Sequence, residues 1–375
     1  MAGLYIHIPF CATRCLYCDF FSSARQQHKA AFLKAILKEM EQRKDYLAGE
    51  TLDTVYMGGG TPSMLSAAEW EPIFEAVCRL FPLAGNAEIT LEANPDDLTP
   101  DYVASLRRLP FNRLSIGIQS FHDEDLRFLR RRHTARQAID AVRLCRDNGY
   151  DNISIDLIYG LPGQTPALWE QNLDEALRLD PVHLSAYHLT YEEGTPLHRL
   201  KEAGLLQPAD EEVSLALFNL LRKRMTEAGY QHYEISNFAR PRCHSRHNSA
   251  YWTGEKYLGV GPSAHSYDRE SRQWNIASLP LYIQGIENDA PCSEKETLNI
   301  HNKYNEYLLT GLRTSRGISL SYMLTKFGEE KYNYCIMQAE RYVNTGILRV
   351  EADKMLFSPD GLRLSDAVIS DLLWV

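Results

Sequence analysis

Residues 5–20 read YIHIPFCATRCLYCDF, an apolar, strand-like start followed by three cysteines within eight residues. The three are Cys11, Cys15 and Cys18. Thiolates this close together can converge on a soft metal centre. Structural zinc takes four protein ligands, so His7 or His28 would have to complete a zinc site. An iron–sulfur cluster held by three thiolates instead leaves one iron open to an exchangeable ligand. The stretch predicts such a cluster, with zinc as the alternative.

The rest of the chain has the composition of an ordinary folded protein. Its 375 residues are 44% hydrophobic and 24% charged, which excludes disordered, collagen-like and fibrous classes. At about 100 to 200 residues per domain, we expect two domains or one α/β domain with an appendage. A net charge of −9 argues against nucleic acid as a partner. No apolar run approaches the ~20 residues of a transmembrane segment and no signal peptide is seen, so we expect a cytoplasmic protein.

Strand-like and helix-like segments alternate from the N-terminus to about residue 190. Such alternation predicts parallel βα units. The expected strands are 4–8, 53–57, 88–91, 113–118, 152–158 and 183–189. The expected helices between them are 31–46, 67–80, 135–147 and 167–179.

Polar and apolar residues alternate within several of these strands. Ile89 and Leu91, for example, are interleaved with Thr90 and Glu92. A parallel sheet covered on both faces would read as nearly continuous apolar runs. We therefore predict an α/β fold in which six βα units form an open, partial (β/α)6 barrel. The polar residues on its inner face would line a ligand cavity, and the functional residues would lie near the C-terminal ends of the strands.

The alternation stops after about residue 195. A helix is expected at 210–229, followed by an aromatic- and histidine-rich loop at 230–267. Two helices and a hairpin at 348–364, with the turn Ser358-Pro359-Asp360-Gly361, predict a small C-terminal α+β module that is winged-helix-like. The expected domain limits are 1–195 for the barrel, 196–298 for a connecting region and 299–375 for the module.

The cysteine segment resembles the radical S-adenosylmethionine (SAM) superfamily. The resemblance is to the branch that holds oxygen-independent coproporphyrinogen III oxidase and the HemW-type haem chaperones. In that superfamily the fold is a partial β/α barrel, and the amino and carboxylate groups of SAM chelate the open iron. The resemblance implies a [4Fe-4S] cluster on Cys11, Cys15 and Cys18, with SAM as a cofactor.

Polar and glycine residues at the expected strand ends suit a bound ligand. Gly58-Gly59-Gly60-Thr61-Pro62 follows the second strand, where glycines allow close approach to the backbone, although a triplet alone is also a common turn. Carboxylates and an amide on the next three strands can accept hydrogen bonds from ribose hydroxyls and an ammonium group, although each alone would also suit a strand cap. The resemblance implies SAM contacts from Tyr5, Tyr17, Gly59, Gly60, Thr61, Glu92, Gln119, Arg131 and Asp156.

Two of these assignments stay open on the residues. Relatives commonly have glycine before the arginine, whereas this chain has Arg130 before Arg131 and Arg132 after it, so any of the three could reach the ligand. Tyr5 and Tyr17 would equally suit packing in the barrel.

A second motif is His247-Asn248-Ser249-Ala250-Tyr251-Trp252. Imidazole is a usual axial ligand of haem iron, although histidines in such loops are often hydrogen-bonded structural residues. The H-N-x-x-Y-W run resembles the chaperone branch, where it is associated with haem binding. His247 is therefore the expected haem ligand, with His265 and Cys243 as lesser candidates.

The resemblance implies a haem chaperone that carries a SAM-chelated [4Fe-4S] cluster, binds haem and transfers it to an unidentified acceptor protein. The alternatives are the oxidase, a radical SAM haem methyltransferase, and a binding protein with a relic cluster. The oxidase has a further cysteine where this chain has Phe20, and an extension ahead of the strand that begins here at Leu4. Both differences favour a chaperone without coproporphyrinogen oxidase activity, while the radical SAM scaffold leaves enzyme activity open.

Overall fold

The computed structural model describes residues 2–375 and contains a 12-stranded sheet with six parallel strands at its centre. These six lie in sequence order, and each pairs in parallel with the next. They are β1 (Ala2–Ile8), β2 (Leu52–Gly59), β3 (Leu83–Ala93), β4 (Arg113–Gln119), β5 (Ile153–Tyr159) and β6 (His183–His188). All six expected strands are confirmed, and they form the predicted α/β partial barrel.

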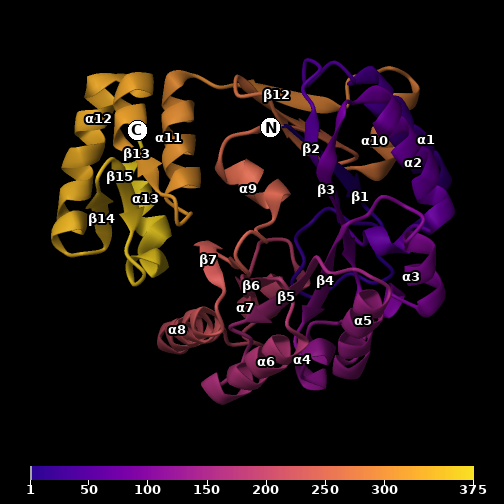
Figure 1. Ribbon diagram of the computed structural model, residues 1–375, viewed down its shortest axis with the longest axis horizontal. Coiled ribbons are helices and arrows are strands. Elements are labelled where there is room, and N and C mark those ends of the chain that lie inside the picture. The colour runs from indigo at the N-terminus through magenta and orange to yellow at the C-terminus, as the bar shows by residue number, and fades with distance from the viewer. Residues whose placement is uncertain (1) are drawn as a thin grey trace.

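Helices cover the outside of these strands (Figure 1). The helices expected at 67–80 and 135–147 are confirmed with those bounds, and a capping box begins each of them. In the first, Trp70, Ile73 and Val77 share the face that packs on the sheet. The helices of this part are α1 (Lys29–Gln42), α2 (Ala67–Leu80), α3 (Pro100–Leu106), α4 (Asp123–Phe128), α5 (Ala135–Asp147), α6 (Pro166–Leu179) and α7 (Pro196–Glu202), with short 3-10 turns η1 (Gln26–His28), η2 (Pro62–Met64) and η3 (Pro95–Asp97).

The prediction of a loop at 230–267 is wrong, because this region forms strands that extend the sheet at both of its edges. Two short antiparallel strands join the edge at β6, and four further strands continue from β1, the first of them parallel to it. The pairing of the first of these four strands with β1 joins residues some 250 positions apart, a relation that local sequence patterns do not record. The elements are α8 (Glu211–Glu227), β7 (Gln231–Glu234), β8 (Asn237–Ala239), α9 (Arg246–Trp252), β9 (Lys256–Val260), β10 (His265–Tyr267), β11 (Ser271–Asn275), α10 (Leu279–Glu287) and β12 (Ser293–Thr297).

The C-terminal α+β unit lies beside the barrel and has a hydrophobic core of its own, drawn from residues 304–372 (Figure 1). Its hairpin turns at Ala352, which adopts a left-handed φ of 52°, and not at Ser358–Gly361 as expected. The Ser358 carbonyl instead accepts from the Gly361 amide, which leads into a 3-10 turn. The elements are α11 (Ile300–Gly311), β13 (Ile318–Ser319), α12 (Leu320–Asn344), β14 (Leu348–Glu351), β15 (Lys354–Phe357), η4 (Gly361–Leu364) and α13 (Ser365–Leu372).

Within residues 2–375, no helix has both the length and the apolar character that a bilayer crossing demands.

Candidate functional site

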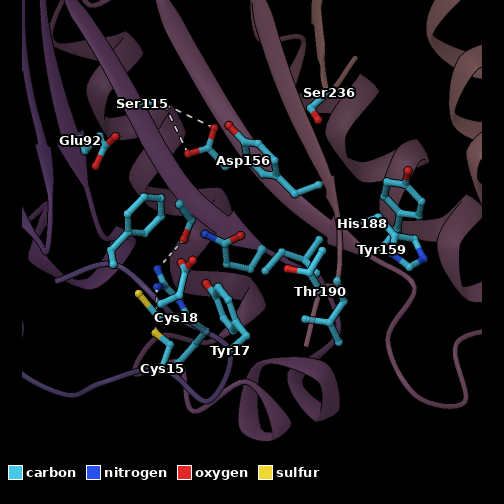
Figure 2. A pocket seen from close by; sticks show the side chains of 18 of the residues that line it. Cys15, Tyr17, Cys18, Glu92, Ser115, Asp156, Tyr159, His188, Thr190 and Ser236 are labelled. Atoms are coloured by element: carbon cyan, nitrogen blue, oxygen red, sulfur yellow. Dashed lines mark hydrogen bonds between the residues drawn. The ribbon is translucent and has the colours of Figure 1, made fainter. Parts of the chain in front are cut away.

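A cavity of about 770 Å³ opens at the C-terminal ends of the barrel strands. The cysteine loop forms one end, the ends of β2 to β6 form its floor, and α8 with residues 362–366 closes the other side. Figure 2 shows Cys15 and Cys18 at one end, Asp156 between, and His188 with Tyr159 on the far side. The cavity therefore lies at the end of the barrel where β/α barrels have their active sites.

The cysteine loop follows β1 directly and is held by backbone hydrogen bonds. The Cys11 amide donates to the Ser23 carbonyl at 3.1 Å, and the Leu16 amide to the Leu129 carbonyl at 3.2 Å. Thr61 Oγ1 lies 3.4 Å from the Cys11 sulfur. All three predicted cysteines line the cavity.

The three thiols fit an iron–sulfur cluster better than zinc. Burial raises the pKa of Cys11, and it raises the pKa of Cys18 to about 11, so the thiolates need a cationic partner. Among the described residues, no three or more His, Cys, Asp or Glu side chains converge so that they could hold a single metal ion. His7, one of the two histidines that could complete a zinc site, lies with Nε2 2.9 Å from the Phe21 carbonyl. A cluster spreads its thiolates over several irons, so the thiols need not converge on one point.

Gly59 and Gly60 line the cavity, but their close contacts are within the protein. Gly59 has a φ of 106°, and a Cβ there would lie 2.5 Å from the His7 ring. A Cβ on Gly60 would lie 2.7 Å from the Phe10 carbonyl oxygen. These glycines therefore let the end of β2 pack against the start of the cysteine loop.

Two carboxylates stand on the inner face of the barrel. Glu92 accepts from Tyr56 Oη at 2.7 Å and from the Gly59 amide at 3.2 Å, and burial raises its pKa to about 7. Asp156 accepts from Ser115 Oγ at 3.3 Å, and burial raises its pKa to about 6 (Figure 2). A cation entering the cavity would stabilise both carboxylates in their charged form.

The three arginines of residues 130–132 all line the cavity, and two of them have partners within the protein. Arg131 lies 3.4 Å from the Cys15 sulfur and donates to the Gly117 carbonyl at 2.6 Å and to Asn94. Its buried Nε has no partner among residues 2–375. Arg132 is held by Asp96 and Asp97 at 2.8 and 2.9 Å. Arg131 is thus the guanidinium beside the cysteines, and Arg130 also lines the cavity.

The structure brings most of the other predicted SAM contacts into this cavity and leaves one outside. Gln119, with a left-handed φ of 71° at the irregular end of β4, lines the cavity, as do Thr61 and Tyr17. Tyr5 does not line the cavity. Its hydroxyl lies 3.1 Å from His7 Nδ1. Asn94, which sequence reasoning missed, lines the cavity directly after β3.

His247 lies apart from this cavity, beside the start of β2 rather than the strand ends. It is 2% exposed, with Nδ1 2.7 Å from Thr54 Oγ1 and Nε2 2.9 Å from Tyr251 Oη. Burial lowers its pKa to about 3. Its role in haem binding stays a prediction, and its surroundings argue against one, because iron ligation would break one of these contacts. The lesser candidates, His265 and Cys243, also lie outside the cavity.

Sequence comparison finds a matching family model and relatives that align over most of the chain. The family model of the radical SAM superfamily matches residues 5–176. The chain is 33% identical to "Heme chaperone HemW" of Mycobacterium tuberculosis, over 99% of this chain and 94% of that protein. It is 34% identical to "Heme chaperone HemW" of Bacillus subtilis, over 88% and 87%.

A solved structure shares the fold over nearly the whole chain. Coproporphyrinogen III oxidase (HemN) from Escherichia coli superposes with a TM-score of 0.87 at 24% identity, covering 99% of this chain and 89% of the oxidase.

Proposed function

Since the chain belongs to the radical SAM superfamily and to the HemW family of haem chaperones within it, we propose that it binds haem and passes it to an acceptor protein, with a [4Fe-4S] cluster and SAM as resident cofactors. One observation carries the proposal: a single cavity contains three thiols, a guanidinium beside them and two carboxylates, and extends well beyond them. A cytoplasmic location and the acceptor remain predictions.

The cluster would be held by Cys11, Cys15 and Cys18. When bound, a cluster of this kind supplies an iron with an open position for the amino and carboxylate groups of SAM. Thr61 and Arg131 lie within hydrogen-bond range of two of the cysteine sulfurs and would stabilise them as thiolates. Glu92 and Asp156 offer acceptors on the inner wall, and the Arg131 guanidinium would favour a ligand carboxylate in the cavity by its charge.

Phe20 supports a chaperone rather than the oxidase. It lines the cavity and is 64% exposed at the position where the oxidase family has a further cysteine. We expect the chain, after anaerobic reconstitution of the cluster, to bind haem stably and to show no decarboxylation of coproporphyrinogen III. Haem binding is followed by absorption and decarboxylation by product analysis, with SAM cleavage assayed separately. Robust decarboxylation would refute the chaperone assignment.

The titration of Glu92 makes SAM binding depend on pH. With a pKa of about 7, the empty site is about half protonated at neutral pH. The sulfonium of SAM is a cation, so the charged carboxylate binds it better. SAM affinity should therefore rise from pH 6 to pH 8, by about tenfold if one proton is released.

Calorimetric titration of the reconstituted protein at several pH values measures this dependence. Glu92→Gln keeps the size of the side chain and removes its titration, so the variant should bind SAM weakly and with a flatter pH profile. Iron and sulfide content serve as the control, because Glu92 is not a cluster ligand. An unchanged profile in the variant would assign the pH dependence to another group.

A further inference from the structure

The cavity has an outer half that the predicted SAM contacts do not occupy. Its walls come from the ends of β5 and β6, from α8 and from residues 362–366 of the C-terminal unit. Figure 2 shows Tyr159, His188, Thr190 and Ser236 on this side, away from Cys15 and Cys18. A second ligand could therefore lie next to SAM in one continuous space.

The outer half is apolar on two sides. Leu215 and Phe218 lie on the face of α8 that lines the cavity, whereas Leu217 and Leu221 on its other side are buried in the barrel core. Leu362 and Leu364 line the cavity from the C-terminal unit. Apolar side chains on separate elements suit a large, flat, apolar ligand.

His188 supplies an imidazole to this half. It ends β6, is exposed toward the cavity, and meets the Tyr159 ring edge-on at 5.2 Å. Burial lowers its pKa, which keeps the ring neutral at pH 7. Its Nε2 has a rotatable hydroxyl, Ser214 Oγ, at 2.9 Å. A Cβ on Gly160 would lie 2.6 Å from that nitrogen, so a glycine is needed for the ring to lie there.

One arginine lines this half of the cavity, and a second lines the adjoining cavity. Arg363 lines both this cavity and an adjoining one of about 230 Å³, and its side chain is exposed. Arg222 lines the adjoining cavity, with its guanidinium 5.7 Å from the Phe218 ring, and reaches Asp360 at 3.7 Å. Of the acidic lining residues, Asp366 is paired with Arg313 at 2.6 Å, while Glu211 begins α8. Guanidinium groups are well suited to carboxylates.

We propose that this outer half is the haem site, with His188 as the iron ligand and Arg363 and Arg222 facing the two carboxylates of the macrocycle. The assignment rests on the proposed function and makes it specific. It replaces His247, which is 2% exposed and lies outside the cavity, with an exposed histidine at the cavity wall. Haem is an apolar plate with a metal at its centre and two carboxylates at one edge, and the three kinds of side chain occur here together.

The test is haem titration of the reconstituted full-length chain, read by absorption. We expect His188→Ala to weaken haem binding by about tenfold or more and to remove the absorption signature of an iron–imidazole bond. Free imidazole added to His188→Gly should restore that signature. His301→Ala is the matched control, because His301 is exposed on α11 outside the cavity.

The other variants separate this site from its alternatives. Arg363→Ala should weaken binding by about threefold, whereas Arg349→Ala, on an exposed strand of the same unit, should not. His247→Ala should keep the wild-type haem spectrum. If the wild type binds no haem, the proposed function fails and the site with it. If His188→Ala keeps the wild-type spectrum and affinity, or if only His247→Ala loses them while its cluster content is normal, the chaperone proposal stands and the His188 site is overturned.

Discussion

Replacing Cys11, Cys15 and Cys18 together with Ala is expected to abolish the cluster. The three are the thiols that line the cavity, so no replacement thiolate is at hand for the irons. The backbone bonds that fix the loop, such as that from the Cys11 amide to Ser23, do not involve the sulfurs, so the chain should still fold. Iron and inorganic sulfide per chain, together with the visible absorption of the cluster, measure the outcome.

Cys78→Ala is the control for this experiment, because Cys78 is exposed on α2 and far from the cavity lining. That variant should keep its full iron and sulfide content. Full iron and sulfide in the triple variant, or a wild type that takes up only zinc, would contradict the cluster assignment.

Glu39→Ala is expected to destabilise the fold by about 3–5 kcal/mol. This carboxylate on α1 is 1% exposed and accepts hydrogen bonds from elements far away in the sequence. The distant donors are the Gly261 amide at 2.8 Å, Asn275 Nδ2 at 2.7 Å and Tyr282 Oη at 2.5 Å. Arg43 Nη1, at the end of the same helix, also donates at 3.2 Å. Removing the acceptor leaves several buried donors unsatisfied at the junction between α1 and β9 to β11.

The midpoint of thermal unfolding measures this effect, and it should fall by several degrees. Glu41→Ala, two residues along the same helix, removes an exposed carboxylate that pairs only with Lys44 and Arg79. That control should leave the midpoint unchanged. Equal midpoints for the two variants would show that the Glu39 contacts do not hold the added strands to the barrel.

The barrel could be predicted because the sequence patterns that indicate it lie within single strands and helices. Each strand carries its own polar and apolar alternation, and helices such as α2 and α5 carry their own capping residues. The same alternation places Glu92 and Asp156 on the inside, so most of the cavity floor followed from the strands. The identity of the metal centre needed the resemblance as well, since three cysteines alone left zinc open.

The remaining features depend on contacts between distant parts of the chain. The pairing of β9 with β1 and the burial of His247 against Thr54 arise from packing that no local pattern records. His188 was missed for another reason. It lies near the end of the predicted strand 183–189, but the aromatic motif around His247 led to the prediction of a haem ligand that the fold buries.

The cavity is built by two separately packed parts of the chain. The barrel alone supplies the half with the cysteines, whereas residues 362–366, from a unit with its own hydrophobic core, complete the other half. Substitutions in that unit can therefore reshape the outer half without disturbing the thiols. In evolutionary terms, the radical SAM barrel can be inherited unchanged while paralogues diverge in the ligand that they bind in the outer half of the cavity.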